Sequence, residues 1–236
     1  IEGLPAYRAG TWTPRAMAMQ PMHAPMTQAE RAIDWVRETT ERVLRKLNAA
    51  DGFPGVADAL FGQPCHIFNA RSHDARGEPG ALLGRVGDGV VRATTDGAVW
   101  LGHAKRPGGI KLPVSMAFPE LAELPMLAED PGAIRYEEQG SVGILHFDFY
   151  NGAMDTAACE RLLVAYLAAR QRPTRVIVLA GGADFFSNGL DLKCIEAAES
   201  PPDESWRNIN AMDDLCQAII DTDSQLTVAA LQGNAG

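Results

Sequence analysis

Phe-Phe-Ser-Asn-Gly-Leu-Asp-Leu-Lys at residues 185–193 follows the run Arg-Val-Ile-Val-Leu-Ala at residues 175–180. The run is apolar without polar alternation, which is typical of a strand buried on both faces in a parallel sheet. A helix is predicted from Leu190 onward. Gly189, between the strand and the helix, allows a sharp turn and leaves backbone N–H groups unpaired at the helix N-terminus. Such N–H groups suit a ligand oxygen that carries negative charge.

The segments around this loop predict a mixed α/β unit over residues 132–236. Its predicted strands lie at residues 134–138, 142–149, 175–180 and 226–231. Gln-Gly-Ser at 139–141 predicts a hairpin between the first two strands, and Asp155 is a candidate cap for the helix that follows them. A second helix is predicted around residues 203–221, and the last strand is predicted to be buried.

A smaller unit is predicted over residues 27–112. Thr27 and Glu30 form a capping-box pattern, and a helix is predicted from there to residue 50. Short runs separated by turns rich in Gly and Asp are predicted as strands at residues 65–70, 82–86, 90–93 and 99–103. Short, evenly spaced strands with such turns predict a small β-barrel behind a leading helix.

Composition separates the two units and narrows their class. Residues 27–112 carry 12 basic and 10 acidic residues, whereas residues 113–236 carry 7 basic and 19 acidic residues. A shift of this size favours two units, and neither has the basic excess of a nucleic-acid-binding domain. No apolar run approaches the ~20 residues that span a bilayer, and no signal-peptide pattern opens the chain. The 4 widely spaced cysteines predict free thiols in a cytoplasmic protein, with no metal site.

Two segments are predicted to lie outside both units. Residues 1–26 have no clear period and are predicted to be an irregular connector. Residues 113–131 are rich in proline and acid, and they are predicted to be a linker. The chain begins at Ile1, and its last predicted strand is followed by a glycine turn at 233–236. We therefore expect an internal fragment of a longer protein.

The loop at residues 185–193 resembles the first oxyanion-hole loop of the crotonase (enoyl-CoA hydratase/isomerase) superfamily. It has that loop's Phe, small residue, Gly and Asp in the same order. Asn-Gly-Ala-Met at 151–154 is similar to the family's turn after its second strand, and Gly-Asn-Ala-Gly at 233–236 is similar to its second glycine turn. The resemblance covers about the first half of a crotonase domain and implies a partial ββα-spiral.

Residues 27–112 resemble the C-terminal part of the formyltransferase family, which includes methionyl-tRNA formyltransferase. The matching segments are Glu-Arg-Ala-Ile-Asp-Trp at 30–35, Phe-Pro-Gly-Val at 53–56 and Asp-Gly-Ala-Val-Trp-Leu at 96–101. This resemblance implies an OB-like barrel. A formyltransferase part followed by a crotonase part is similar to the HypX/HoxX hydrogenase-maturation factors. Phe-Asp-Phe-Tyr-Asn-Gly-Ala-Met at 147–154 and Ser-Trp-Arg-Asn-Ile-Asn at 205–210 are also similar to that family.

The HypX/HoxX resemblance implies an enzyme that transfers a formyl group from formyl-tetrahydrofolate to coenzyme A. The same resemblance implies release of carbon monoxide from formyl-CoA for the nickel–iron hydrogenase centre. The implied cofactors are coenzyme A and a tetrahydrofolate bound by a domain upstream of Ile1. The implied partners are an acyl-CoA and other hydrogenase-maturation proteins, with no nucleic acid and no membrane. The fragment alone is expected to be inactive.

The crotonase resemblance also assigns roles within the loop. It implies that the backbone N–H of Leu190 is the first oxyanion donor, and that Asn188, Gly189 and Leu190 contact coenzyme A. The second donor and the acid/base residues are expected beyond Gly236.

Three charged residues near the loop have other expected roles. Asp191 is expected to cap the helix after the loop rather than to react. Lys193 and Arg172 are candidates for binding CoA phosphates, although solvated surface cations are the alternative. Two other functions stay open for the whole chain. One is an ordinary crotonase-type hydratase or isomerase fused to an unrelated barrel, and the other is a non-catalytic CoA-binding or scaffold protein.

Overall fold

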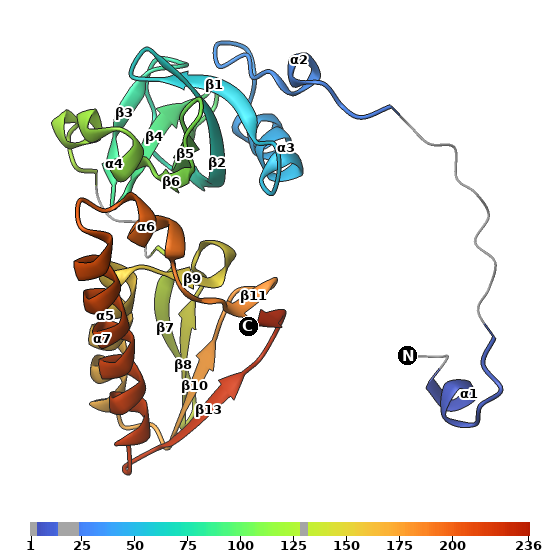
Figure 1. Cartoon of the computed structure of the whole chain (residues 1–236), viewed down its shortest axis with the longest axis vertical. Helices are drawn as coiled ribbons and strands as arrows, with labels where there is room; N and C mark the ends of the chain where they lie inside the picture. The colour runs from blue at the N-terminus through green and yellow to red at the C-terminus, as the bar shows by residue number, and fades with distance from the viewer. Residues whose placement is uncertain (1–3, 14–23, 128–131) are drawn as a thin grey trace.

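The computed structural model describes residues 4–13, 24–127 and 132–236, which form a short N-terminal helix and two larger units (Figure 1). The helix is α1 (Leu4–Arg8), within the predicted connector. The rest of that connector lies partly outside the described residues, as do residues 128–131 at the end of the predicted linker. Among the described residues no helix is both long and apolar enough to cross a membrane.

The first unit is built on an antiparallel sheet of six strands. The order of its strands is β1-β2-β5-β4-β3, and β6 pairs with β5. The strands are β1 (Val56–Leu60), β2 (Gln63–His73), β3 (Leu82–Val86), β4 (Gly89–Ala93), β5 (Ala98–Lys105) and β6 (Lys111–Pro113). The four predicted strands are therefore confirmed as β2 to β5, whereas β1 and β6 were not predicted. Asp58 in the middle of β1 hides its apolar pattern, and β6 is only three residues long.

The leading helix is broken into α2 (Gln28–Arg31) and α3 (Thr40–Ala50), so the prediction of one helix to residue 50 is wrong. Ala32 leaves the helical conformation with a ψ of 135°. Thr39 then starts α3, because its side chain accepts a hydrogen bond from the backbone N–H three residues later. Trp35, in the connecting turn, is buried and donates from its indole N–H to a carboxylate on β1 at 2.6 Å. The turn thus inserts a tryptophan into the core that a continuous helix would carry elsewhere.

The segment predicted as a linker begins inside the first unit. It contains α4 (Val114–Ala117) and a 3-10 turn, η1 (Pro119–Glu123). Val114, Phe118 and Leu121 are buried in the same core as α3 and the sheet. The prolines that suggested a linker instead shape two short turns of helix against the sheet.

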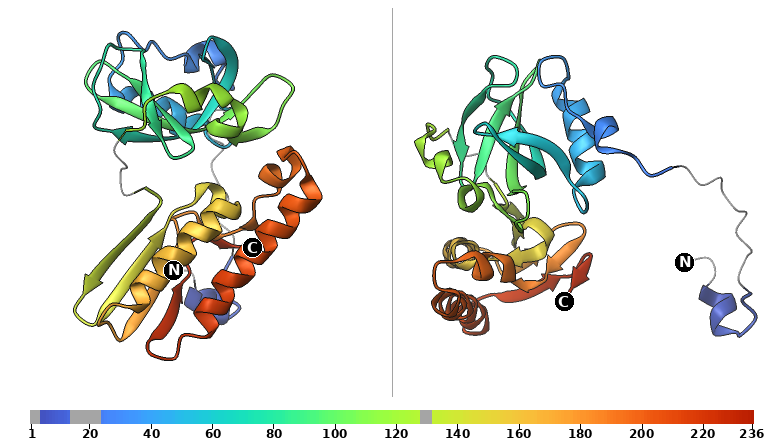
Figure 2. Two further views of the ribbon diagram at one scale, coloured as in Figure 1. Left: turned by 90° about the vertical axis from the view of Figure 1, so that its left-hand side faces the viewer. Right: turned by 45° about the horizontal axis from the view of Figure 1, so that its top comes forward.

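The second unit is a mixed four-stranded sheet with its order β13-β10-β8-β7. The strands are β7 (Ile134–Gln139), β8 (Val142–Phe147), β10 (Val176–Ala180) and β13 (Leu226–Ala230). β7 and β8 form the predicted hairpin, and β10 runs parallel to both of its neighbours. The helices α5 (Thr156–Arg170) and α7 (Pro201–Ile220) lie side by side on one face of this sheet (Figure 2). The predicted mixed α/β class and element order are confirmed.

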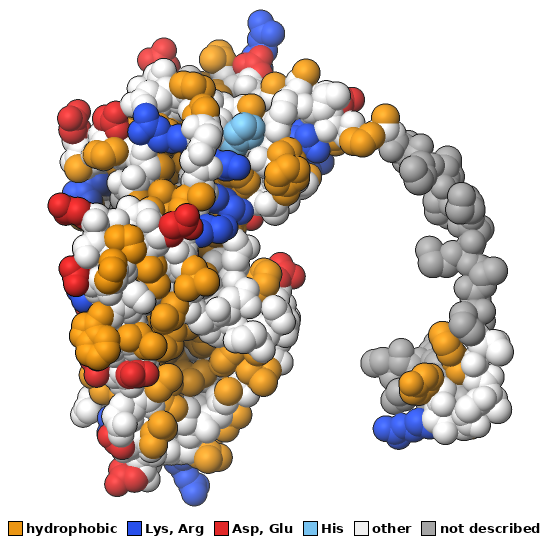
Figure 3. Space-filling model, viewed as in Figure 1, with side chains coloured by type: hydrophobic (Ala, Val, Ile, Leu, Met, Phe, Trp, Pro, Cys, Tyr) orange, Lys and Arg blue, Asp and Glu red, His pale blue; other side chains and the backbone are white. Residues whose placement is uncertain are grey.

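The last strand is more exposed than its sequence suggested. β13 is an edge strand, and Leu226 is 64% and Val228 39% exposed, so the prediction of a buried strand is wrong for the part of the chain described. On α7, Trp206 and Ile220 are exposed as well. Figure 3 shows hydrophobic side chains spread over this side of the second unit.

Short segments beyond the C-terminal ends of β8, β10 and β13 build the candidate site. They form two small parallel ladders, β9 with β12 and β11 with β14. The segments are η2 (Tyr150–Gly152), β9 (Ala153–Met154), β11 (Phe185–Ser187), β12 (Gly189–Leu190), α6 (Leu192–Ala197) and β14 (Asn234–Ala235). The three glycine-containing stretches singled out in the sequence thus lie next to one another.

Candidate functional site

The predicted oxyanion loop pairs with β9 in a parallel register. Gly189 lies opposite Ala153 and Leu190 opposite Met154, and the N–H of Asp191 donates to the carbonyl oxygen of Met154 at 2.9 Å. Successive N–H groups along an extended strand point to opposite sides. Because the N–H of Asp191 points to β9, the N–H of Leu190 points away from it. The register therefore leaves this N–H directed out of the ladder.

The backbone conformation of Gly189 allows the Leu190 N–H to point out of the ladder. The N–H of Asn188 also donates toward the β9 side, to the carbonyl oxygen of Gly152 at 2.7 Å. Asn188 and Asp191 are an odd number of residues apart, so in an unbroken strand their N–H groups would point to opposite sides. The φ of +74° at Gly189 breaks the strand between them. A Cβ there would meet nothing within 4 Å, so the backbone angle rather than lack of space requires glycine.

Asn188 joins the three glycine-containing segments. Its Nδ2 donates to the carbonyl oxygen of Asn151 at 2.6 Å, and its Oδ1 accepts from Nδ2 of Asn234 at 3.3 Å. The side chain is thus used by the protein itself. Contact of Asn188 and Gly189 with coenzyme A stays a prediction.

Asp191 and Asp155 act as helix caps. The carboxylate of Asp191 accepts from the backbone N–H groups of Lys193 and Cys194, at 3.0 and 3.2 Å, as expected from the sequence. Asp155 accepts from the N–H of Ala158 at 2.7 Å and caps α5. Burial raises the pKa of Asp155 above its usual range. Both carboxylates therefore have a structural task at the start of a helix.

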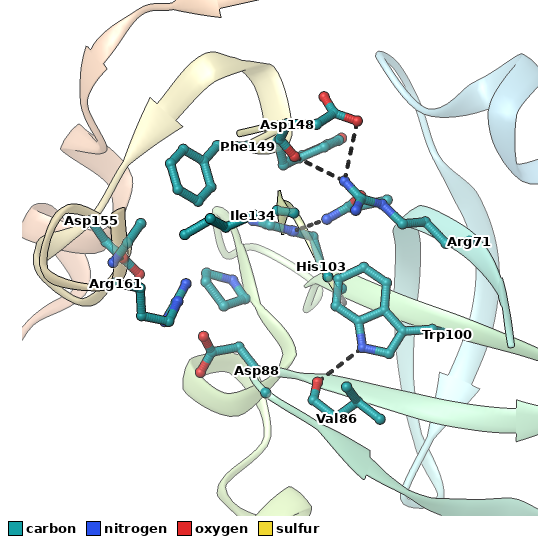
Figure 4. A pocket seen from close by; sticks show the side chains of 18 of the residues that line it. Arg71, Val86, Asp88, Trp100, His103, Ile134, Asp148, Phe149, Asp155 and Arg161 are labelled. Atoms are coloured by element: carbon teal, nitrogen blue, oxygen red, sulfur yellow. Dashed lines mark hydrogen bonds and ion pairs between the residues drawn. The ribbon is translucent and has the colours of Figure 1, made fainter. Parts of the chain in front are cut away.

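A cavity of about 550 Å³ lies between the two units and borders the loop (Figure 4). This volume is in the range of small-molecule sites. Its lining mixes aromatic and charged side chains from both units. Those that the following paragraphs use are Arg71, Trp100 and His103 from the first unit and Asp148, Tyr150 and Asp155 from the second. Asp191, next to the predicted donor, also lines it. The sequence did not predict this cavity.

One ion pair crosses the cavity from unit to unit. Nη2 of Arg71 donates to the backbone carbonyl oxygen of Asp148 at 2.9 Å and lies 3.5 Å from its carboxylate (Figure 4). The guanidinium also lies 5.8 Å from the ring centre of Trp100, and the indole N–H of that tryptophan donates to Val86 at 3.0 Å. Arg71 is therefore held on both sides at the boundary between the units.

His103 presents a neutral ring at this boundary. Its Nδ1 lies 3.1 Å from Nδ2 of Asn69, and since an amide nitrogen can only donate, Nδ1 accepts and Nε2 carries the proton. Burial lowers the pKa of His103 to about 3, helped by the nearby charges of Lys111 and Lys193. The imidazole stacks on Tyr150 with 4.3 Å between ring centres.

Tyr150 makes two hydrogen bonds and a ring contact to the first unit. Its hydroxyl accepts a hydrogen bond from Nζ of Lys111 at 2.7 Å and donates to the carbonyl oxygen of Asp51 at 3.2 Å. Burial raises the pKa of the Tyr150 phenol and lowers that of the Lys111 ammonium. Lys111 also lies over the ring of Phe68 at 4.3 Å. Tyr150 is the first residue of η2, the turn that Asn188 contacts, so its side chain ties the first unit to the loop.

The two cations considered for CoA phosphates lie in different places. Lys193 is the last residue of the loop and is exposed, close enough to affect the pKa of His103. Arg172 pairs with Glu138 at 2.6 Å, at the far end of the sheet from the loop. The structure thus keeps Lys193 near the loop and gives Arg172 a partner elsewhere.

The described residues contain no cluster of three or more His, Cys, Asp or Glu side chains that could hold a metal ion. The 4 cysteines are free, and Cys65, Cys159 and Cys194 are buried. Burial raises the pKa of Cys65 and Cys159 to about 11, so both remain thiols at neutral pH. Neither can serve as a ready nucleophile.

Comparison with known proteins adds three findings. Residues 25–119 match the family described as formyl transferase, C-terminal domain. The chain is 50% identical to the hydrogenase maturation factor HoxX of Bradyrhizobium diazoefficiens, over 100% of this chain and 43% of that protein. It is also 39% identical over 87 residues to a methionyl-tRNA formyltransferase of Paraburkholderia phymatum, which covers 36% of this chain and 26% of that one.

A solved structure matches the whole chain. The crystal structure of HypX from Aquifex aeolicus in complex with tetrahydrofolic acid aligns with a TM-score of 0.89 and 41% identity. The alignment covers 100% of this chain and 44% of the HypX chain. This chain therefore spans less than half the length of these two relatives.

Proposed function

Because this chain belongs to the family of the hydrogenase maturation factors HoxX and HypX, we propose that it holds the thioester carbonyl of formyl-CoA at the N–H of Leu190. In the whole protein the formyl group passes from formyl-tetrahydrofolate to the thiol of coenzyme A, giving tetrahydrofolate and formyl-CoA. Cleavage of the C–S bond then releases carbon monoxide, and the formyl hydrogen ends on the regenerated thiol. The tetrahydrofolate in the HypX crystal structure supports folate as the formyl carrier.

The direction of the Leu190 N–H carries this proposal. It points out of the β9–β12 ladder, because the neighbouring N–H of Asp191 is the one bound to Met154. A fixed N–H aimed at an oxygen that gains negative charge needs no reorganisation during the reaction. Loss of one such donor typically costs about 10²–10³ in rate. The bulk of the Leu190 side chain favours an acyl group as small as formyl.

The roles of the two units follow from their chemistry. The formyltransferase-type unit contributes Arg71, Trp100 and His103 to a cavity that it shares with the loop-bearing unit. A neutral His103 can donate from Nε2 without adding charge near a thioester. We assign to this cavity the acyl end of the CoA thioester, beside the predicted donor.

A backbone donor is tested by removing its hydrogen. Leu190→Pro deletes this N–H while the Asp191–Met154 hydrogen bond remains available. We expect carbon monoxide release from formyl-tetrahydrofolate and coenzyme A to fall by about 10²-fold or more in the whole protein. The released gas is measured by its absorbance shift on reduced haemoglobin.

Leu190→Ala is the matched control, because it shortens the side chain and keeps the N–H. We expect it to release carbon monoxide at more than a tenth of the wild-type rate. Calorimetric binding of acetyl-CoA and of free CoA is compared in all three proteins. A folded Leu190→Pro variant that keeps the wild-type preference for acetyl-CoA would show that Leu190 is not the donor.

A further inference from the structure

Asn208 is a buried polar residue on α7 with an unusual balance of hydrogen bonds. It belongs to the Ser-Trp-Arg-Asn-Ile-Asn segment at 205–210, to which the proposed reaction gives no role. Its side chain is fully buried, at 0% exposure. Nδ2 donates to the carbonyl oxygen of Met154 at 3.3 Å and lies 3.8 Å from the sulfur of Cys159. Oδ1 is buried and has no hydrogen-bond partner among the described residues.

Stability does not explain an asparagine at this position. A buried carbonyl oxygen without a partner costs more free energy than one long neutral hydrogen bond contributes. The neighbouring buried positions on this face of α7, Ala211 and Leu215, are apolar. A leucine has nearly the same shape as asparagine and would satisfy the packing without an unpaired oxygen. The side chain is therefore placed for something other than core stability.

The hydrogen bond of Asn208 to Met154 links this side chain to the oxyanion loop. The carbonyl oxygen of Met154 accepts from Nδ2 of Asn208 and also from the N–H of Asp191, at 2.9 Å. Met154 lies opposite Leu190 in the β9–β12 ladder. A carbonyl held by two donors cannot rotate freely about the backbone. The orientation of this carbonyl sets the plane of the Leu190–Asp191 peptide, whose N–H donates to it. Through that peptide it sets the direction of the Leu190 N–H.

We infer that Asn208 is a positioning residue that fixes the direction of the Leu190 N–H from behind the loop. This inference rests on the proposed function, since it requires Leu190 to be the oxyanion donor. Asn208 does not touch the substrate. It acts through Met154, and misplacing a reacting group by about 1 Å can cost about 10²-fold in rate.

The first test removes both polar atoms of the side chain with Asn208→Leu in the whole protein. We expect the kcat for carbon monoxide release to fall about tenfold to a hundredfold. KM for coenzyme A should stay within threefold of wild type, because the loop is not lost. The thermal unfolding midpoint should be equal to or above that of wild type, because the unpaired oxygen is gone.

Asn210→Leu is the matched control on the same helix. Asn210 is exposed, and its side chain bonds only within α7, to the backbone of Trp206. The same change in chemistry there should leave kcat within twofold of wild type. A fall in kcat with Asn210→Leu as large as with Asn208→Leu would assign the effect to α7 in general and overturn the inference.

A second test restores the donor by pH with Asn208→Asp. Burial raises the pKa of the introduced carboxyl well above its usual value of about 3.9. In its neutral form the carboxyl donates to Met154, and in its ionised form it cannot. We therefore expect kcat, relative to wild type at the same pH, to be near 1 at low pH and to fall as pH rises.

The other titratable groups around Asn208 do not obscure the pH dependence of the kcat ratio. On the elements packed against α7 they are Cys159 and Asp155 of α5, and Asp191 and Cys194 at the start of α6. Burial raises the pKa of both thiols further above neutral, so they stay uncharged. The two aspartates cap the starts of α5 and α6, and burial raises the pKa of Asp155. They are present in wild type as well, so the ratio of the two proteins removes their own titration.

The outcomes separate the inference from the proposed function. If Leu190→Pro abolishes carbon monoxide release but Asn208→Leu keeps wild-type kcat, Asn208 does not position the donor, and the inference is wrong. If Leu190→Pro keeps full release, the proposed donor itself is wrong. A flat pH ratio for Asn208→Asp, with kcat low throughout, also overturns the inference, because a protonated carboxyl should replace the amide.

Discussion

The ring of His103 is held neutral by its position between the two units. Its pKa is about 3 in the folded protein, against 6.5 as the ordinary value, so between these values the unfolded chain binds a proton that the folded protein excludes. The sign follows from this difference: this residue makes the folded protein less stable as pH falls from 6.5 to 3. The slope reaches up to about 1.4 kcal/mol per pH unit for one such group. Denaturant unfolding at several pH values measures it.

The contribution of one histidine is isolated by comparing wild type with His103→Gln. A glutamine can still accept from Asn69 but does not titrate. We expect the variant to have a shallower loss of stability between pH 6.5 and pH 4 than wild type. Equal slopes in the two proteins would mean that His103 takes up its proton in the folded state.

Two glycines of the site differ in what a methyl group would meet. Gly189→Ala places an L-residue at a φ of +74° in open space and should cost about 1 kcal/mol of unfolding free energy. At Gly152, φ is +67° and an added Cβ would lie 2.7 Å from the Cβ of Phe185 and 3.1 Å from the amide nitrogen of Asn188. Gly152→Ala should therefore cost more, about 2–4 kcal/mol. Chemical denaturation checks the order, and a larger loss at Gly189 would contradict it.

Among the elements, α6 depends on one cap next to the predicted donor. Asp191→Ala removes the acceptor for the N–H groups of Lys193 and Cys194 and should cost about 0.5–2 kcal/mol of stability. Asp191→Asn keeps a capping oxygen and should retain most of the stability and of the carbon monoxide release. If the asparagine variant folds like wild type but is inactive, Asp191 has a chemical role beyond capping.

Local sequence signals were sufficient to predict some helices and strands of this chain but not others. The capping box at Thr27 and Glu30 is present, and β3 lies where a short run between turns rich in Gly and Asp predicted it. The break between α2 and α3 was missed because it depends on Trp35 reaching a carboxylate on β1, a contact 23 residues away. The buried turns at α4 and η1 were missed for a similar reason, since only the finished sheet offers them a surface.

The candidate site was predictable only where it is local. Asn188, Gly189 and Leu190 are consecutive, and the glycine turn among them follows from the sequence pattern. The cavity was not predictable, because Arg71 and His103 come from a different unit and meet the loop only through tertiary packing. Asn208 was also out of reach, since a buried asparagine in a helix has the same sequence signature as an exposed one.

For the whole molecule, the contact between Lys111 and Tyr150 couples the two units. Their hydrogen bond is 2.7 Å long and involves a half-buried charge. In a double-mutant cycle of Lys111→Met and Tyr150→Phe we expect a coupling free energy of about 1–3 kcal/mol. The free energies of unfolding of the four proteins, from denaturant titrations, provide the cycle.

A matched cycle pairs Lys111→Met with Tyr7→Phe. Tyr7 is 68% exposed on α1 and has no contact with Lys111. Its coupling with Lys111 should be zero within about 0.5 kcal/mol. Coupling of equal size in both cycles would mean that the Lys111–Tyr150 bond does not join the units in solution.

The side chain of Asn188 also has a consequence for the order of events during synthesis. Its two partners lie 37 residues before it and 46 residues after it. At about 5–20 residues per second, the ribosome needs roughly 2–9 s to make the later partner after Asn188 itself. Throughout that interval the nascent chain holds a loop with one side of its support missing. The loop at residues 185–193 therefore gains its full hydrogen-bonded support only after Asn234 has been made.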